Sequence, residues 1–184
     1  MADATALRRP LEFTSADWRA AVPSLTRFVF RGDQSARAAA GRAFDVVLPE
    51  TACRSAVESS RSRAALWLGP DEHLLLAPDG EGERVAADLA VALSGHAHSL
   101  VDVSHRQVAF RVIGPRAEWL IESQCPLPLN ERDFPVGMCT RTIFSKAEIV
   151  LWRTAAQDFH VEVWRSFSAY VVGLLREVAF EMDR

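Results

Sequence analysis

The chain has 184 residues, of which 49% are hydrophobic and 24% are charged, and its formal net charge is −3. A chain of this length buries roughly 70% of its unfolded surface, so it needs neither a disulfide nor a metal to hold a core. The small negative charge excludes a general attraction to nucleic acid or anionic lipid, and no apolar run approaches the ~20 residues of a membrane span. Because Cys53, Cys125 and Cys139 are odd in number and widely spaced, we expect reduced thiols and a cytoplasmic location.

The first 25 residues follow neither the helical nor the strand period, although a short helix between Ser15 and Val22 fits part of them. We treat 1–25 as an N-terminal arm and 26–184 as a single α+β domain. Leu11 and Phe13 are apolar side chains on this irregular arm. They require cover, either from a partner chain or from the domain itself, and they are our first candidates for a partner interface.

The next part of the chain alternates single helices with short strands. Asp33 is placed to cap a helix by accepting hydrogen bonds from its first free amides. Gly69 to Glu72 is a turn signature between two apolar runs, which predicts a hairpin. In chain order we expect a strand at 26–30, a helix at 35–44, a serine-rich loop at 49–63, strands at 66–68 and 74–77, and a helix at 83–93.

Residues 100–123 form the stretch around which the chain is organised. Val101 and Val103 predict one strand, 108–113 predicts a second, and the polar run between them predicts a hairpin turn. Gly114 and Pro115 end the second strand, because proline cannot donate to a ladder but suits the first turn of a helix. We expect that helix to begin at Arg116.

Residues 125–135 contain three prolines in eleven positions and cannot form a regular element. We interpret them as a long connection with exposed Leu127, Leu129 and Phe134, which we add to the candidate partner interface. Beyond it, we expect strands at 138–144, 148–152 and 159–164, and then a last helix with apolar side chains at spacings of three and four.

The predicted order is β-α-ββ-α-ββ-α-βββ-α. Hairpins that alternate with single helices build antiparallel sheets with helices on one face. The fold class that follows is α+β, with two split β-α-β (ferredoxin-like) units.

Three residue types of a hydrolase triad occur together in Asp102, Ser104 and His105. Their spacing favours a turn with local hydrogen bonds, because neighbours on a strand point to opposite faces and triad members normally converge from distant segments. The acidic and glycine-rich run at 79–83 lacks the third glycine of a dinucleotide fingerprint, and its carboxylates would repel a pyrophosphate.

Other groups of chemically active residues are also better explained as structure. His96 and His98 have no further His or Cys nearby to complete a metal site. Glu148 and Glu162 lie on neighbouring predicted strands, where carboxylates usually occupy the wet face. Three tryptophans are candidates for a ligand platform, but such rings are more often core or interface: Trp119, Trp152 and Trp164. We therefore assign no catalytic, cofactor-binding or metal-binding residue to this chain.

A family resemblance adds what these patterns do not contain. The blocks LWLGPDEHLLLAP, LVDVSHRQVAFRVIGPRAEWLIESQCPLPL and FPVGMCTRTIFSKAEIVLWRTAAQDFHVEVWRSFSAYVVGLL resemble the gamma subunit family of heterotetrameric sarcosine oxidase. That family is similar in turn to the folate-binding domain of the glycine-cleavage T-protein, a fold that suits the element order above.

The resemblance implies a non-catalytic structural subunit that works with alpha, beta and delta chains. The complex oxidatively demethylates sarcosine to glycine, with formaldehyde or 5,10-methylenetetrahydrofolate and hydrogen peroxide as products. It uses FAD, FMN, NAD, zinc and tetrahydrofolate, none of which we expect on this chain. The alternative is a stand-alone folate-dependent protein of T-protein type that transfers an aminomethyl or one-carbon unit, for which Asp102 is the candidate residue to activate the amine.

Overall fold

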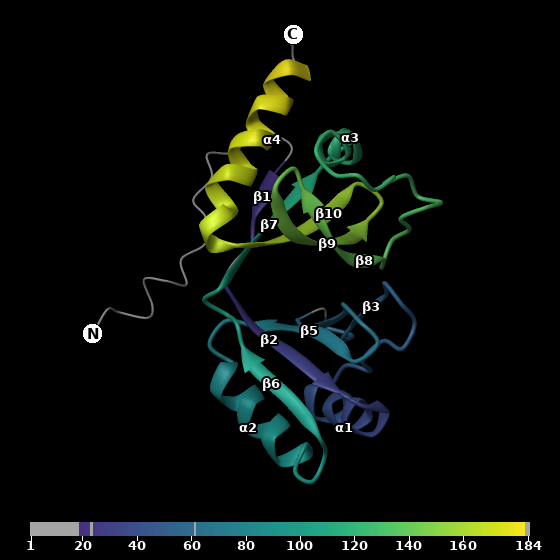
Figure 1. Cartoon of the computed structure of the whole chain (residues 1–184), viewed down its shortest axis with the longest axis vertical. Coiled ribbons are helices and arrows are strands. Elements are labelled where there is room, and N and C mark those ends of the chain that lie inside the picture. The colour runs from purple at the N-terminus through teal and green to yellow at the C-terminus, as the bar shows by residue number, and fades with distance from the viewer. Residues whose placement is uncertain (1–18, 23, 61, 183–184) are drawn as a thin grey trace, which may run out of the picture. The chain divides into compact units, whose positions relative to one another are not determined.

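The computed structural model describes residues 19–22, 24–60 and 62–182. Within them the chain forms two compact units, one within 24–104 and one that joins 19–22 to 105–182. Each unit has its own antiparallel sheet (Figure 1) and its own apolar core. The boundary falls inside the range that we expected to be a single domain, and the division into an arm (1–25) and one domain (26–184) stays a prediction. Leu11 and Phe13 lie outside the described residues.

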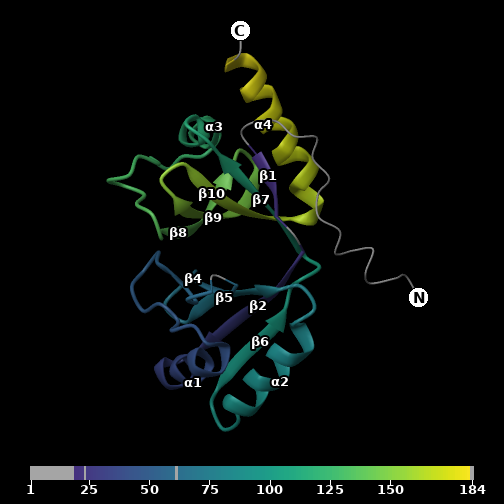
Figure 2. The ribbon, with the colours of Figure 1, turned by 180° about the vertical axis from the view of Figure 1, so that it is seen from behind.

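The unit of 24–104 is built on a five-stranded sheet, sheet B, with strand order β3-β4-β5-β2-β6. Helices α1 and α2 pack on the same face of this sheet, and Figure 2 shows the ribbon from the side opposite to Figure 1. The elements are β2 (Leu25–Gly32), α1 (Gln34–Phe44), β3 (Ser55–Val57), β4 (Ala64–Trp67), β5 (Glu72–Pro78), α2 (Gly82–Ala92) and β6 (His98–Asp102).

The unit that contains 105–184 is built on sheet A, with strand order β1-β7-β10-β9-β8. Side chains of α3 and α4 join those of its strands in one apolar core. The elements are β1 (Arg19–Ala21), β7 (Gln107–Ile113), α3 (Ala117–Glu122), β8 (Cys139–Phe144), β9 (Ala147–Ala155), β10 (Asp158–Trp164), the 3₁₀ helix η2 (Arg165–Phe167) and α4 (Ser168–Met182).

The two sheets repeat one topology. In sheet B, β5 lies between β2 and β4, and the chain passes from β2 to β4 through α1 and β3. In sheet A, β10 lies in the same way between β7 and β9, and the chain passes from β7 to β9 through α3 and β8. This is the split β-α-β arrangement, so the predicted fold class is confirmed. The second neighbour of β2 in sheet B is β6. The second neighbour of β7 in sheet A is instead β1, which comes from the N-terminal end of the chain.

Local signals placed most elements correctly. Asp33 caps α1, because its carboxylate accepts a hydrogen bond from the amide of Ala36 at 2.8 Å. Three local expectations were wrong or incomplete. Residues 19–21 form a strand on β7 and not a helix, the serine-rich segment contains β3, and 101–112 is not a hairpin.

The hairpin prediction fails because β6 and β7 belong to different sheets. Beyond β6 the backbone continues along β2, since the amide of Val103 donates to the carbonyl of Arg27 at 2.9 Å. The amide of Arg27 in turn donates to Ser104 Oγ at 2.9 Å. The polar run at 104–107 therefore links the two units and does not reverse the strand.

Two further features bear on the class of protein. None of the helices within the described residues is long and apolar enough to cross a membrane. The three cysteines are free thiols, with Cys125 and Cys139 buried.

Candidate functional site

Asp102 and Ser104 form a local turn. The Asp102 carboxylate accepts hydrogen bonds from the amide of Ser104 at 2.8 Å and from its hydroxyl at 2.5 Å. Ser104 is buried, and its oxygen accepts the hydrogen bond from Arg27 described above. His105 contributes its backbone carbonyl to Arg165 Nε at 3.2 Å. This geometry fits a side-chain-capped turn and leaves the serine oxygen occupied by backbone.

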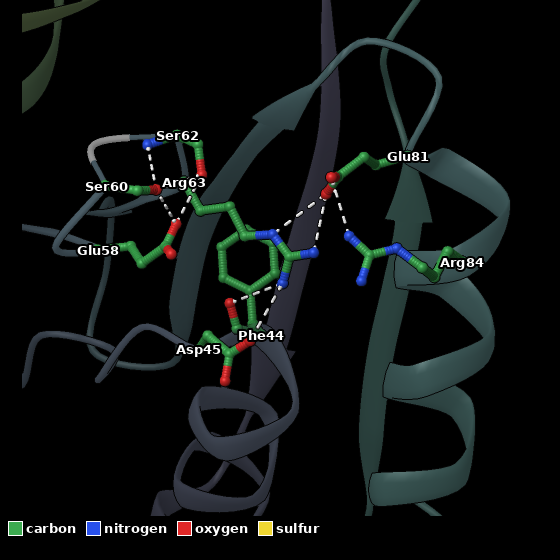
Figure 3. Close-up of polar contacts among 8 residues, drawn as sticks. All are labelled: Phe44, Asp45, Glu58, Ser60, Ser62, Arg63, Glu81 and Arg84. Atoms are coloured by element: carbon green, nitrogen blue, oxygen red, sulfur yellow. Dashed lines mark hydrogen bonds and ion pairs between the residues drawn. The ribbon is translucent and has the colours of Figure 1, made fainter.

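The acidic turn before α2 is part of a cluster around Arg63, a buried residue directly before β4 (Figure 3). Its guanidinium donates to Glu81 from Nε at 3.2 Å and from Nη2 at 2.8 Å. It also donates from Nη1 to the carbonyl of Phe44 at 3.2 Å and lies 5.3 Å from the centre of the Phe44 ring. Arg63 thus connects the end of α1 to the start of α2.

Charge placement in this cluster suits both helices. A cation at the carboxyl end of α1 and a carboxylate at the amino end of α2 each complement the helix dipole. The hydrogen bonds from Arg63 lower the pKa of the Glu81 carboxyl, and Arg84 adds to the effect from 2.8 Å. The amino end of α2 therefore already carries an anion, and its residues do not fit a dinucleotide pyrophosphate.

The paired histidines make local contacts. His96 Nδ1 lies 3.0 Å from Ser35 Oγ, and His98 Nδ1 lies 2.9 Å from the carbonyl of His96. Among the residues that the structure describes, no three His, Cys, Asp or Glu side chains converge as metal ligands. The residues of this pair do not fit a zinc site, which needs three or four such ligands.

Glu148 and Glu162 have different environments. Glu148 is exposed and faces Arg141 at 3.8 Å. Glu162 is fully buried, and its carboxylate lies 2.8 Å from His160 Nε2. One carboxylate is thus exposed beside a guanidinium and the other is buried beside an imidazole, which does not match a pair that faces one substrate.

The three tryptophans do not form a platform. Trp152 packs at 5.6 Å from the His160 ring, whereas Trp164 lies beneath Arg106. Trp119 is half exposed on α3. The rings of Trp152 and Trp164 therefore have different neighbours.

The proline-rich connection differs from our expectation. Leu129 and Phe134 are buried in the core of their own unit, and Leu127 is partly buried against it. Their burial contradicts the exposure from which we inferred an interface role. The interface role of Leu127 stays a prediction.

Arg153 on β9 explains why this connection folds inward. Its side chain is 2% exposed, and Nη1 donates to the carbonyls of Leu129 at 2.7 Å and Phe134 at 3.0 Å. Nη2 donates to Glu118 at 2.5 Å and to the carbonyl of Ala156. A buried cation thus satisfies backbone acceptors that the prolines leave without a regular partner.

Sequence reasoning missed Arg63 and Arg153, although a signal for both was present. Arg153 continues the period-two pattern of Ile149 and Leu151, which are buried on the core face of β9. Arg63 precedes Ala65 by two residues and therefore shares its core-facing side. A charged residue in phase with a buried face predicts a buried, multiply bonded cation.

Within the described residues, then, these polar side chains close a turn, join helix ends, hold a loop or pair with a neighbouring polar side chain. The chain shares its fold with a protein of known structure. It matches glycine cleavage system aminomethyltransferase T from Bartonella henselae with a TM-score of 0.62 at 12% identity, over 83% of this chain and 43% of that one. That match shows a shared fold.

Closer matches define the family. The model of the sarcosine oxidase, gamma subunit family matches residues 31–181, and the chain belongs to this family. It is 33% identical over 123 residues to the sarcosine oxidase subunit gamma of Corynebacterium sp. (strain P-1), which covers 67% of this chain and 60% of that relative. It also matches a chain of the heterotetrameric sarcosine oxidase from Corynebacterium sp. U-96, in complex with pyrrole 2-carboxylate, with a TM-score of 0.83 and 28% identity, over 90% of this chain and 85% of that one.

The alignments with the curated relatives span 50 to 60% of those relatives' lengths.

Proposed function

We propose that this chain is the gamma subunit of a heterotetrameric sarcosine oxidase and serves in it as a non-catalytic structural subunit. Its partners are the alpha, beta and delta chains. The complex demethylates sarcosine to glycine by oxidation and releases hydrogen peroxide with formaldehyde or 5,10-methylenetetrahydrofolate. The match over 90% of the chain to a chain of a heterotetrameric sarcosine oxidase carries this proposal.

The environments of the polar residues support a structural role. A nucleophile needs a base within hydrogen-bond reach, and that base needs a third group to orient it. Here Ser104 is bonded to the carboxylate of its own turn. The buried guanidinium groups of Arg63 and Arg153 donate to backbone carbonyls, and Arg63 also joins two helix ends. Such bonds stabilise the positions of a loop and of two helices.

The cofactors of the complex belong, in this proposal, to the other chains. FAD, FMN, NAD, zinc and tetrahydrofolate are the groups that we expect there. On this chain, the start of α2 holds Glu81 where a pyrophosphate would require a donor. The gamma subunit then contributes folded surface to the assembly, and substrate choice depends on another chain.

Co-expression tests this proposal. The chain should elute with the alpha, beta and delta subunits in size-exclusion chromatography, in a peak that absorbs at flavin wavelengths. Purified alone, it should be colourless and should release no hydrogen peroxide from sarcosine. A lone chain that turned over sarcosine, or one that never joined the other three, would refute the proposal.

A second candidate function is the stand-alone, folate-dependent one-carbon transfer. The observation in its favour is the fold shared with aminomethyltransferase T. Against it, the Asp102 carboxylate, which would have to activate the amine, accepts two hydrogen bonds from Ser104 in a turn. Isothermal titration of the isolated chain with tetrahydrofolate separates the two functions, since only the second requires heat of binding.

A further inference from the structure

Three aromatic side chains are exposed where β10 passes into α4. Trp164 ends β10, Phe167 ends η2 and Tyr170 lies in the first turn of α4, with exposed fractions of 41%, 42% and 38%. Their spacing of three residues places Phe167 and Tyr170 on the same side of the helix, because side chains at i and i+3 are neighbours. Together with Arg106 we name them the aromatic–arginine patch.

The patch is held in place by contacts within its own unit. The guanidinium of Arg106 lies 5.3 Å from the centre of the Trp164 ring. The amide of Arg165 donates to the carbonyl of Arg106 at 2.9 Å, which fixes the linking turn against η2. At the other end, the Tyr170 hydroxyl donates to Ser145 Oγ at 3.0 Å. These contacts already restrict the side chains of the patch, so ordering them on binding costs little conformational entropy.

The local charge of the patch is positive, although the whole chain carries −3. Arg106 forms no ion pair with the described residues, and the neighbouring Arg165 donates from Nε to the carbonyl of His105. Residues 103–117 and 163–176, the segments that carry the patch, contain no Asp or Glu. Charge complementarity therefore favours an acidic partner surface.

The size and composition of the patch fit the centre of a protein interface. Taking about 200 Å² for an aromatic side chain, the three rings leave roughly 250 Å² in water at their exposed fractions. That is about a third of the ~800 Å² that each partner contributes to an interface of standard size. Trp, Tyr and Arg are also the residues most enriched among those that dominate binding energy.

We propose that the aromatic–arginine patch is the docking surface for an acidic, partly apolar segment of another chain of the oxidase complex. This inference rests on the proposed function and adds the surface and the chemistry of its partner. The patch lies within the 31–181 match to the gamma subunit family. The similar solved chain comes from a heterotetrameric enzyme, so surfaces of this fold meet other chains there.

The test measures the affinity of the purified chain for a complex of the alpha, beta and delta subunits by biolayer interferometry. Trp164→Ala removes one ring, and Trp119→Ala is its matched control, since Trp119 is 50% exposed in the same unit. Arg106→Glu reverses the charge, Arg106→Lys retains it, and Arg176→Glu is the control on the exposed side of α4. Circular dichroism melts verify that each variant is folded.

We expect Trp164→Ala to weaken binding about 30-fold, as for a central interface residue, and Arg106→Glu to weaken it at least roughly tenfold. The affinities of Arg106→Lys and of both controls should stay within about threefold of the wild-type affinity. Higher salt should reduce the difference in affinity between the wild type and Arg106→Glu. Equal binding by Trp164→Ala and Trp119→Ala, or by Arg106→Glu and Arg176→Glu, would overturn the docking surface while the subunit role stands. Failure of the wild-type chain to bind would instead overturn the proposed function and the inference with it.

Discussion

Replacing Arg153 by alanine should destabilise the unit that contains 105–184. The side chain is 2% exposed, and its guanidinium donates to the carbonyls of Leu129 and Phe134, both in buried surroundings. Its Cζ also lies 5.0 Å from the centre of the Phe159 ring. The variant leaves these carbonyls without a donor and opens a space beneath the proline-rich connection.

The magnitude follows from these contacts. Each buried carbonyl left without a partner costs about 1–3 kcal/mol, and the lost ring contact adds about 0.5–2 kcal/mol. Removing the buried cation also removes the free-energy cost of taking it out of water, which offsets part of this loss. Breaking a buried ion pair typically costs about 3–5 kcal/mol, and we expect a loss of that size here. Since a domain is stable by only about 5–15 kcal/mol, the loss is a large fraction of the total.

Urea denaturation followed by circular dichroism and tryptophan fluorescence measures the effect. With a slope of about 1–3 kcal/mol per molar urea, we expect the midpoint for Arg153→Ala to fall by roughly 2 M. The urea midpoint of Arg153→Lys should lie between those of Arg153→Ala and the wild type, because an ammonium retains the charge but reaches fewer acceptors.

The matched control is Arg132→Ala in the same connection. Its side chain is 87% exposed and contacts the neighbouring Asp133, and we expect no measurable change in midpoint. If Arg153→Ala lowered the midpoint no further than Arg132→Ala does, Arg153 would not be what holds the connection, and our reading of the buried cation would be refuted.

Three further predictions concern the two units separately. Because Arg63 lowers the pKa of Glu81, the pair stabilises the fold above the ordinary glutamate pKa and loses that contribution as pH falls through the lowered value. Thermal midpoints of Glu81→Gln and of the wild type should therefore differ at pH 7 and converge in acid. Burial lowers the pKa of His73, whose Nε2 lies 2.7 Å from the carbonyl of Pro49. Folding consequently excludes a proton, and stability should fall below about pH 6.5, by at most about 1.4 kcal/mol per pH unit, whereas His73→Gln should show a smaller slope. Deletion of 1–22 removes β1, which pairs with β7 at 19–21, and should speed hydrogen exchange of the β7 amides without affecting β2.

Each of these three has an opposing result. A constant difference between Glu81→Gln and the wild type from pH 7 to pH 3 would show that the carboxylate charge is unimportant. An unchanged acid slope in His73→Gln would assign the proton to another group. Unaltered exchange on β7 after the deletion would mean that β1 does not protect that edge.

Local patterns predicted most of the elements but not how the strands pair. The helix expected at 35–44 with its Asp33 cap corresponds to α1, and the strand expected at 108–113 corresponds to β7. Both depend on periodicity and on contacts within a few residues. The hairpin predicted from 101 to 113 was wrong, because a polar run between two strands does not determine whether those strands pair with each other. The first of them, β6, pairs with β2 instead.

The candidate site was predictable in one respect only. The spacing of Asp102 and Ser104 indicated a turn, and the structure confirms it. The roles of Arg63 and Arg153 were not recognised, because acceptors that define them, Glu81 and Leu129, lie 18 and 24 residues away along the chain. Leu129 and Phe134 were misjudged for the same reason, since it is Arg153 that draws their backbone inward.

The amino-acid sequence by itself determined the α+β class, the succession of helices and strands and the membership of a family, since these depend on local periodicity and on residue type. Only the tertiary structure decided that the elements divide between two sheets, that β1 completes sheet A beside β7, and that Arg63 and Arg153 are buried. Strand pairing and the burial of charge are set by groups far apart in the chain, such as Arg19 and Val112. Their free energies depend on which partners the completed fold brings into contact.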